Sequence, residues 1–227
     1  MSDGASLLEV VQGLLERTYR MRSAVSEIGR FVIGDTGYRQ LYAREVPAPT
    51  GAGSGGDGAR TLVRETGAGV RACIYYPDDL IVTLERHPPY RGLGEENVEA
   101  FATLVEEVDH LLCIAERVRE QRPVSLFELE LHANVSKHLV LTRFLSGSGS
   151  PIDGLRRAWL RWHLFHKGAP SDPDADVAAR YRDAIRWALR FLDAGTRLRP
   201  EARIDTLRRF HAAGAAGKLE LIRGLAA

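Results

Sequence analysis

The feature that most constrains the fold is a helical spacing of apolar residues that continues, with few interruptions, from residue 77 almost to the end of the chain. Short segments rich in proline and glycine divide this region. They place helices near residues 77–86, 95–121, 124–146, 151–167, 173–195, 200–213 and 215–225. Because most connections are short, consecutive helices are expected to pack as neighbours in one bundle.

The N-terminal part carries one further helix. Ser6 and Glu9 have the spacing of a capping box, in which the serine hydroxyl and the glutamate carboxylate bond each other's free backbone donors. The apolar residues that follow repeat at helical spacing, and the pattern predicts that this helix continues through Val32 and ends near Gly34.

The only clear β pattern lies between this helix and the helical region. Residues 46–59 combine prolines and glycines with little that could pack, which predicts a flexible surface loop. The segments 61–66 and 70–76 flank a glycine-rich turn and predict a hairpin, which needs helices or a third strand to support it. We therefore expect a mainly α protein with one domain over residues 1–227, in which a helical body (77–225) carries a small β-hairpin insertion near 61–76.

Composition narrows the functional classes. No apolar run approaches the roughly 20 residues of a membrane helix, and the N-terminus lacks the pattern of a secretion signal. Cys73 and Cys113 are isolated, which favours a reducing compartment, so a cytoplasmic protein is expected. Lysine occurs at only three positions while arginine is frequent, which indicates a GC-rich bacterial source. The net charge of +1 disfavours general binding of nucleic acid or membranes.

Ionisable residues on the two helices predicted near 95–121 and 124–146 do not fit a plain bundle. Glu107 and His110 lie three residues apart at the edge of an apolar arc, the spacing with which helix bundles present two metal ligands. Glu106 is expected to be solvated, and Cys113 to lie on the polar side of its helix. Because Cys113 also lacks an oxyanion-hole motif, a Cys/His nucleophile is disfavoured.

The helix near 124–146 is apolar almost all round, so it is expected to be buried. It nevertheless carries Glu128, Glu130, His132, Lys137 and His138, whose burial costs several kcal/mol unless they find partners. Glu128 could be explained by a capping box with Ser125.

Two interpretations of these residues remain open. In one, Glu107, His110 and His132, together with Glu128 or Glu130, converge on a divalent metal ion or a bound substrate, with Glu107 and His110 as candidate catalytic residues. In the other, which we favour, the groups form a structural network, for instance Glu130 with Lys137 and Glu107 with an arginine.

A second candidate surface covers residues 156–167, where cations alternate with aromatic rings. Arg156, Arg157, Arg161 and Lys167 could bind a polyanion while tryptophans stack on bases. The alternative is an amphipathic helix that packs into the bundle through four residues at helical spacing, which are Leu155, Trp159, Trp162 and His166.

Three functions are therefore compared. The leading prediction is a non-enzymatic interaction or scaffold protein, with a protein partner or a second copy of itself and a buried Glu/His/Lys network. The first alternative is a metal-dependent, hydrolase-like enzyme using Glu107, His110 and His132; the HExxH, GxSxG and P-loop motifs are absent. The second alternative is a weak binder of polyanions or nucleic acid through residues 156–167. The basic segment 203–224 could dock on the body or on a partner.

Overall fold

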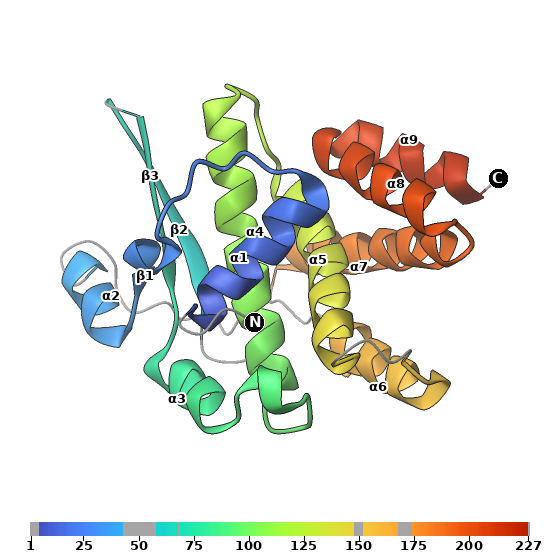
Figure 1. The fold of residues 1–227 in the computed structure, drawn as a ribbon. Coiled ribbons are helices and arrows are strands. Elements are labelled where there is room, and N and C mark those ends of the chain that lie inside the picture. Colours follow the sequence, from blue (N-terminus) through green and yellow to red (C-terminus); the bar gives the residue numbers. More distant parts are fainter. Residues whose placement is uncertain (1–4, 43–57, 68, 148–151, 168–173, 227) are drawn as a thin grey trace.

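The computed structural model describes residues 5–42, 58–67, 69–147, 152–167 and 174–226. Within these ranges the chain is mainly helical with a small three-stranded sheet, as expected (Figure 1). The α-helices are α1 (Leu7–Tyr19), α2 (Asp35–Tyr42), α3 (Asp78–Arg86), α4 (Val98–Arg119), α5 (Leu126–Leu145), α6 (Gly154–Phe165), α7 (Ala175–Thr196), α8 (Pro200–Ala212) and α9 (Ala215–Ala226). The strands are β1 (Val32–Ile33), β2 (Arg60–Thr66) and β3 (Gly69–Tyr75).

The sheet has the order β1-β3-β2. Strands β2 and β3 form the predicted antiparallel hairpin, with Arg60 opposite Tyr75 and Thr66 opposite Gly69. The third strand that a hairpin needs is β1, which runs parallel to β3 and pairs Val32 with Ile74. Most of the predicted loop, residues 46–57, lies outside the described residues.

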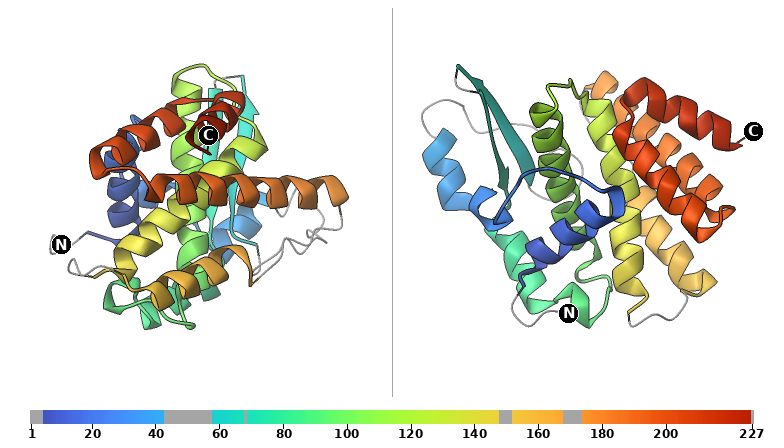
Figure 2. Two further views of the ribbon diagram at one scale, coloured as in Figure 1. Left: turned by 90° about the vertical axis from the view of Figure 1, so that its right-hand side faces the viewer. Right: turned by 45° about the horizontal axis from the view of Figure 1, so that its top comes forward.

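Helix α4 is the centre of the arrangement. The sheet lies on one side of it, while α8 and α9 lie on the other side of the α4–α5 pair (Figure 1). Helix α5 returns beside α4 after a short connection, and α7 crosses α5 and packs against α9 (Figure 2). The core contains residues from every described α-helix except α2, and the middle of α5 is buried on all sides as expected, from Glu128 to Lys137.

The first helix is shorter than predicted. Its capping box is present, but α1 ends at Tyr19 because Arg20 adopts a left-handed backbone conformation with φ of 57°. The chain beyond it is held against α4, where Glu116 accepts a hydrogen bond from the backbone N–H of Arg22 at 2.7 Å. This tertiary contact replaces the continued helix. Strand β1 stands where the helix was predicted to end, and α2 follows as an element that was not predicted.

The packing face of α6 also differs from the prediction. Leu155 is 86% exposed and Trp162 is 48% exposed, whereas the buried residues of this helix are Leu160, His163 and Phe165. Three of the four residues predicted to pack are therefore exposed, whereas the fourth, Trp159, is partly buried against the core. The rings of Trp159 and Trp162 flank His163.

Candidate metal centre

The ionisable residues of α4 and α5 separate into two clusters. We call the first the acidic cluster; it consists of Glu106, Glu107 and His110 on α4 and Glu130 and Lys137 on α5. We call the second the histidine cluster; it consists of Asp109, Cys113 and Glu116 on α4, His132 on α5 and His211 on α8. The two clusters exist because consecutive residues of α4 point in different directions, toward the sheet or toward α8.

The acidic cluster lies where β2 meets α4. The Thr61 hydroxyl donates a hydrogen bond to Glu107 Oε2 at 2.8 Å, and the same oxygen lies 3.7 Å from His110 Nδ1. Lys137 Nζ donates to Glu106 Oε2 at 2.7 Å. The lysine therefore neutralises the neighbouring glutamate, Glu106, whereas the sequence suggested Glu130 as its partner and a solvated Glu106.

The charges of this cluster act strongly on one another. Burial alone lowers the pKa of His110, but the hydrogen bond and charge of Glu107 outweigh it and raise the pKa to about 10. Burial and the charge of Glu106 raise the pKa of Glu130 to about 7. Three carboxyl groups thus share two cationic side chains, and the negative charge is only partly compensated.

His110 has a further property. The residue is 9% exposed, and its Nε2 atom is buried without a hydrogen-bond partner. One ligand atom from each of Glu106, His110 and Glu130 lies within 4.8 Å of the others. Buried polar atoms are almost always bonded, so an unpaired imidazole nitrogen beside carboxylates is typical of a site for a cation or a water molecule.

The histidine cluster forms a chain of hydrogen bonds across three helices. His132 Nδ1 lies 2.8 Å from Asp109 Oδ2, and His132 Nε2 lies 3.1 Å from His211 Nδ1. His211 Nε2 in turn lies 2.5 Å from Glu116 Oε2. Burial lowers the pKa of His132 to about 4, although the charge of Asp109 opposes the shift.

Glu128 belongs to this side of the molecule. The Ser125 hydroxyl accepts from its backbone N–H, but the Glu128 carboxylate turns inward and pairs with Arg117 at 2.9 Å and with Lys218 at 3.2 Å. Lys218 is 1% exposed and also donates to the backbone oxygens of His211 and Ala213, at the end of α8. The predicted capping box thus explains the backbone of Glu128 but not its side chain.

The structure divides the four predicted metal ligands. Glu107 and His110 belong to the acidic cluster, whereas His132 belongs to the histidine cluster and Glu128 pairs with cations beside it. Glu107 meets Thr61 and His110 instead of the expected arginine.

Several buried groups were missed or misplaced by the sequence analysis. Asp109, Glu116, His211 and Lys218 gave no local signal, since their partners lie on other helices. Cys113 is buried instead of lying on a polar face, and its Sγ lies 3.4 Å from His132 Nδ1. The scarcity of lysine in the chain was the one usable signal, because both Lys137 and Lys218 prove to be buried.

The predicted anion-binding cations of α6 mostly face acidic residues. Arg161 pairs with Asp193 at 2.8 Å, and Lys167 pairs with Glu99 at 2.6 Å. Arg157 donates to the backbone oxygen of Ile152. Arg156 lies 3.9 Å from Asp153 and remains largely exposed.

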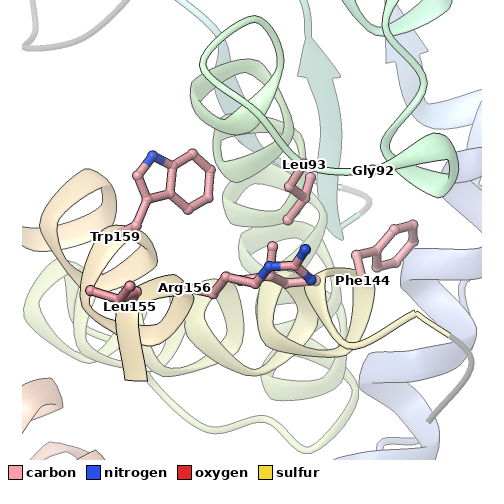
Figure 3. Close-up of a pocket in the computed structure, with 7 residues that line it drawn as sticks. Gly92, Leu93, Phe144, Leu155, Arg156 and Trp159 are labelled. Atoms are coloured by element: carbon pink, nitrogen blue, oxygen red, sulfur yellow. The ribbon is translucent and has the colours of Figure 1, made fainter. Parts of the chain in front are cut away.

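Arg156 borders a surface groove of about 360 Å³ between α6, the end of α5 and the segment before α4 (Figure 3). The groove is lined by Gly92, Leu93, Phe144, Leu145, Leu155, Arg156 and Trp159. Its walls are therefore mostly apolar, with one guanidinium at the rim.

Comparisons of this chain with protein-family models, with curated proteins and with solved structures found no match. None of the helices in the described part of the chain combines the length and the apolar character needed to cross a membrane. A functional assignment therefore depends on the chemistry of the two clusters.

Proposed function

We propose that this protein binds a divalent metal ion in the acidic cluster, with Glu106, His110 and Glu130 as ligands and Glu107 as an adjacent carboxylate. Two observations carry the proposal together: His110 Nε2 is buried without a hydrogen-bond partner, and one ligand atom from each of Glu106, His110 and Glu130 lies within 4.8 Å of the others. A metal ion would displace the proton of the His110 imidazolium and take the lone pair of a ring nitrogen, with the neighbouring carboxylates as its other ligands.

The donor set indicates the class of metal. Two carboxylates and one imidazole suit Mn²⁺, Fe²⁺ or Zn²⁺, and carboxylate-bridged sites in helix bundles use the same residue types. The i, i+4 spacing of Glu106 and His110 places both side chains on one face of α4. Glu130 comes from the neighbouring helix, so the ion would link α4 to α5.

Charge balance supports the same proposal. Glu130 has its pKa raised to about 7 by burial and by Glu106, which reflects negative charge that Lys137 and His110 do not fully offset. A dication would compensate it. Lys137 occupies one oxygen of Glu106, so its ammonium group must give up this contact, or share it, when the ion binds.

The acidic cluster also has two features that a metal-dependent enzyme needs, which are access from solvent and a nearby carboxylate. The Glu106 side chain is 23% exposed, which gives an ion and one water molecule an approach from solvent. A metal bound there would lower the pKa of a coordinated water. Glu107, held by Thr61, is the carboxylate positioned to accept a proton; His132 belongs to the other cluster and takes no part.

The test is calorimetric titration with Mn²⁺, a metal that prefers oxygen and imidazole ligands to thiolate. We expect one ion per chain, and a loss of affinity of about tenfold or more in His110→Gln and Glu130→Gln. Glu85→Gln, which removes an exposed carboxylate from α3, should leave the affinity unchanged. Circular dichroism of each variant verifies that it is folded.

The proposal fails if wild-type protein does not bind Mn²⁺, or if the folded His110→Gln and Glu130→Gln variants bind it as tightly as wild type. In either case the acidic cluster is a structural network, as the sequence analysis favoured.

An interaction role is the second candidate, favoured by one observation. Leu155 is 86% exposed beside the mostly apolar groove of α6, an unusual position for a leucine on a monomer surface. If this face binds a second copy of the chain, the molar mass from light scattering should rise with concentration, and Leu155→Asp should abolish the rise. A constant monomer mass rules out self-association through this face.

Two expectations from the sequence accompany these proposals. A reducing, cytoplasmic location is consistent with Cys73 and Cys113, which are both free thiols. A single domain is consistent with one apolar cluster that includes Val11 of α1 and Ile222 of α9.

A further inference from the structure

We propose that Cys113, His132 and His211 form a second metal site, with a sulfur and two nitrogen ligands suited to Zn²⁺. This site does not depend on the acidic cluster, because it has different residues, a different ligand chemistry and a different position, between α4, α5 and α8.

The two imidazole rings are oriented as metal-binding histidines are. Each has one nitrogen on a buried carboxylate: His132 Nδ1 on Asp109 at 2.8 Å and His211 Nε2 on Glu116 at 2.5 Å. Such carboxylate partners fix the tautomer and direct the other ring nitrogen toward the metal. The two other nitrogens, His132 Nε2 and His211 Nδ1, face each other at 3.1 Å.

The facing nitrogens need something between them. Carboxylates accept hydrogen bonds, so Asp109 and Glu116 each take the N–H of one neutral ring. Two neutral rings would then direct lone pairs at each other across 3.1 Å, which is repulsive. Either one added proton or one metal ion removes this repulsion, and the separation is close to the roughly 3.3 Å between two nitrogens on a tetrahedral zinc ion.

Cys113 supplies the third ligand. One ligand atom from each of Cys113, His132 and His211 lies within 4.8 Å of the others. The three residues line a small cavity of about 10 Å³, which is enough for one water-sized particle. In this structure Sγ lies nearest to His132 Nδ1, at 3.4 Å, so binding of zinc between the facing nitrogens requires the Cys113 side chain to turn toward them. Glu128, which lines the same cavity, or a water molecule would be the fourth ligand.

Zinc binding exchanges a proton for the metal ion. The Cys113 thiol must lose its proton to become a thiolate ligand, while His132 Nε2 and His211 Nδ1 supply lone pairs. At least one proton therefore leaves for each ion bound. The fixed charges around the site are Asp109, Glu116 and Glu128 against Arg117 and Lys218, so the surroundings tolerate a cation.

The geometry argues against a thiol nucleophile in the same place. His132 Nδ1 is the nitrogen nearest to Cys113, at 3.4 Å, but Asp109 already occupies that nitrogen. A catalytic dyad requires the base nitrogen to be free for the thiol while the carboxylate holds the other one. Burial and the charge of Asp109 also raise the pKa of Cys113, which keeps the free thiol protonated.

The experiment uses Co²⁺ as a spectroscopic substitute for Zn²⁺, added to the full-length protein both folded and during refolding. A thiolate ligand gives a sulfur-to-cobalt charge-transfer band, which the oxygen and nitrogen ligands of the acidic cluster cannot produce. We expect this band at one Co²⁺ per chain, its loss on addition of Zn²⁺, and release of at least one proton per ion in a pH-indicator assay.

Two cysteine variants form a matched pair. Cys113→Ser should lose the band, and Cys73→Ser, which changes the thiol on β3, should keep it. Glu107→Gln should also keep it, which separates this site from the acidic cluster. The absence of a charge-transfer band in wild-type protein after refolding, or its persistence in Cys113→Ser, would overturn the proposal whatever the stability of the variants.

Discussion

His138 shows how one buried residue links stability to pH. It lies on α5 with its ring stacked on Phe165, and its buried Nδ1 has no hydrogen-bond partner. Burial and the nearby guanidinium of Arg161 lower its pKa to about 4 from the ordinary 6.5. The folded protein therefore keeps this imidazole neutral at pH values where the unfolded chain protonates it.

We predict that His138 reduces stability in mild acid. Between pH 6.5 and about 4 the His138 imidazole is protonated in the unfolded state but not in the folded state. The free energy of unfolding therefore falls as the pH falls. The contribution is on the order of 2–3 kcal/mol at the lower end of this window. Urea unfolding of wild type and His138→Phe at several pH values measures it, and the difference between the two should grow in acid. The control is His87→Phe, at an exposed position. If the difference in free energy of unfolding between wild type and His138→Phe were as constant with pH as that for His87→Phe, the prediction would be wrong.

At the scale of elements, the end of α1 illustrates a tertiary contact that overrides a helical pattern. The backbone of Arg20 is left-handed, a conformation that costs a residue with a Cβ roughly 1–2 kcal/mol. The interaction of Arg22 with Glu116, and the hydrogen bond from Arg119 to the Arg22 carbonyl at 2.8 Å, hold the chain on α4 and compensate this cost.

Arg20→Gly is therefore expected to stabilise the protein by about 0.5–1 kcal/mol, since glycine adopts this conformation without a steric penalty. Thermal or urea unfolding measures the change. The matched variant is Arg17→Gly, three residues earlier and inside α1, which should destabilise by about 1 kcal/mol. Equal effects of the two substitutions would show that the backbone conformation at Arg20 is not what limits stability.

The bounds of the later helices could be predicted from the sequence, whereas the buried face of α6 could not. The helices from α3 to α9 begin and end within about three residues of the predicted positions, because proline, glycine and capping residues act locally. The buried face of α6 was wrong because two rows of apolar residues run along that helix. Only the position of its neighbours decides that Leu160 faces inward and Leu155 faces solvent.

At the scale of the whole molecule, surface ion pairs determine the affinity of the protein for a polyanion. Arg161 and Lys167 face Asp193 and Glu99, so two of the four cations in the strip 156–167 are neutralised by close carboxylates. We predict no salt-dependent binding of single-stranded nucleic acid by wild-type protein in fluorescence anisotropy.

Lys167 also lies 3.6 Å from Glu95, so the triple variant Glu95→Gln/Glu99→Gln/Asp193→Asn is needed to free both cations. It should gain weak affinity that disappears as salt is added. Binding by wild type with a steep salt dependence would mean that these ion pairs open in solution, and would restore the polyanion hypothesis.

The sequence by itself determined the helical fold class, the hairpin and the burial of α5, because periodicity, breakers and caps are properties of neighbouring residues. It also identified Glu107 and His110 as a pair, since one helical turn joins them. Only the tertiary structure decided that Glu128 and His132 have partners other than Glu107 and His110. Those partners include His211, which contacts His132, and Lys218, which contacts Glu128; Glu116 contacts His211 in turn. Those contacts connect residues about 80–95 positions apart, and they depend on the packing of α8 and α9 against α4 and α5. Spacing along one helix carries no information about which side chain a distant helix will bring to it.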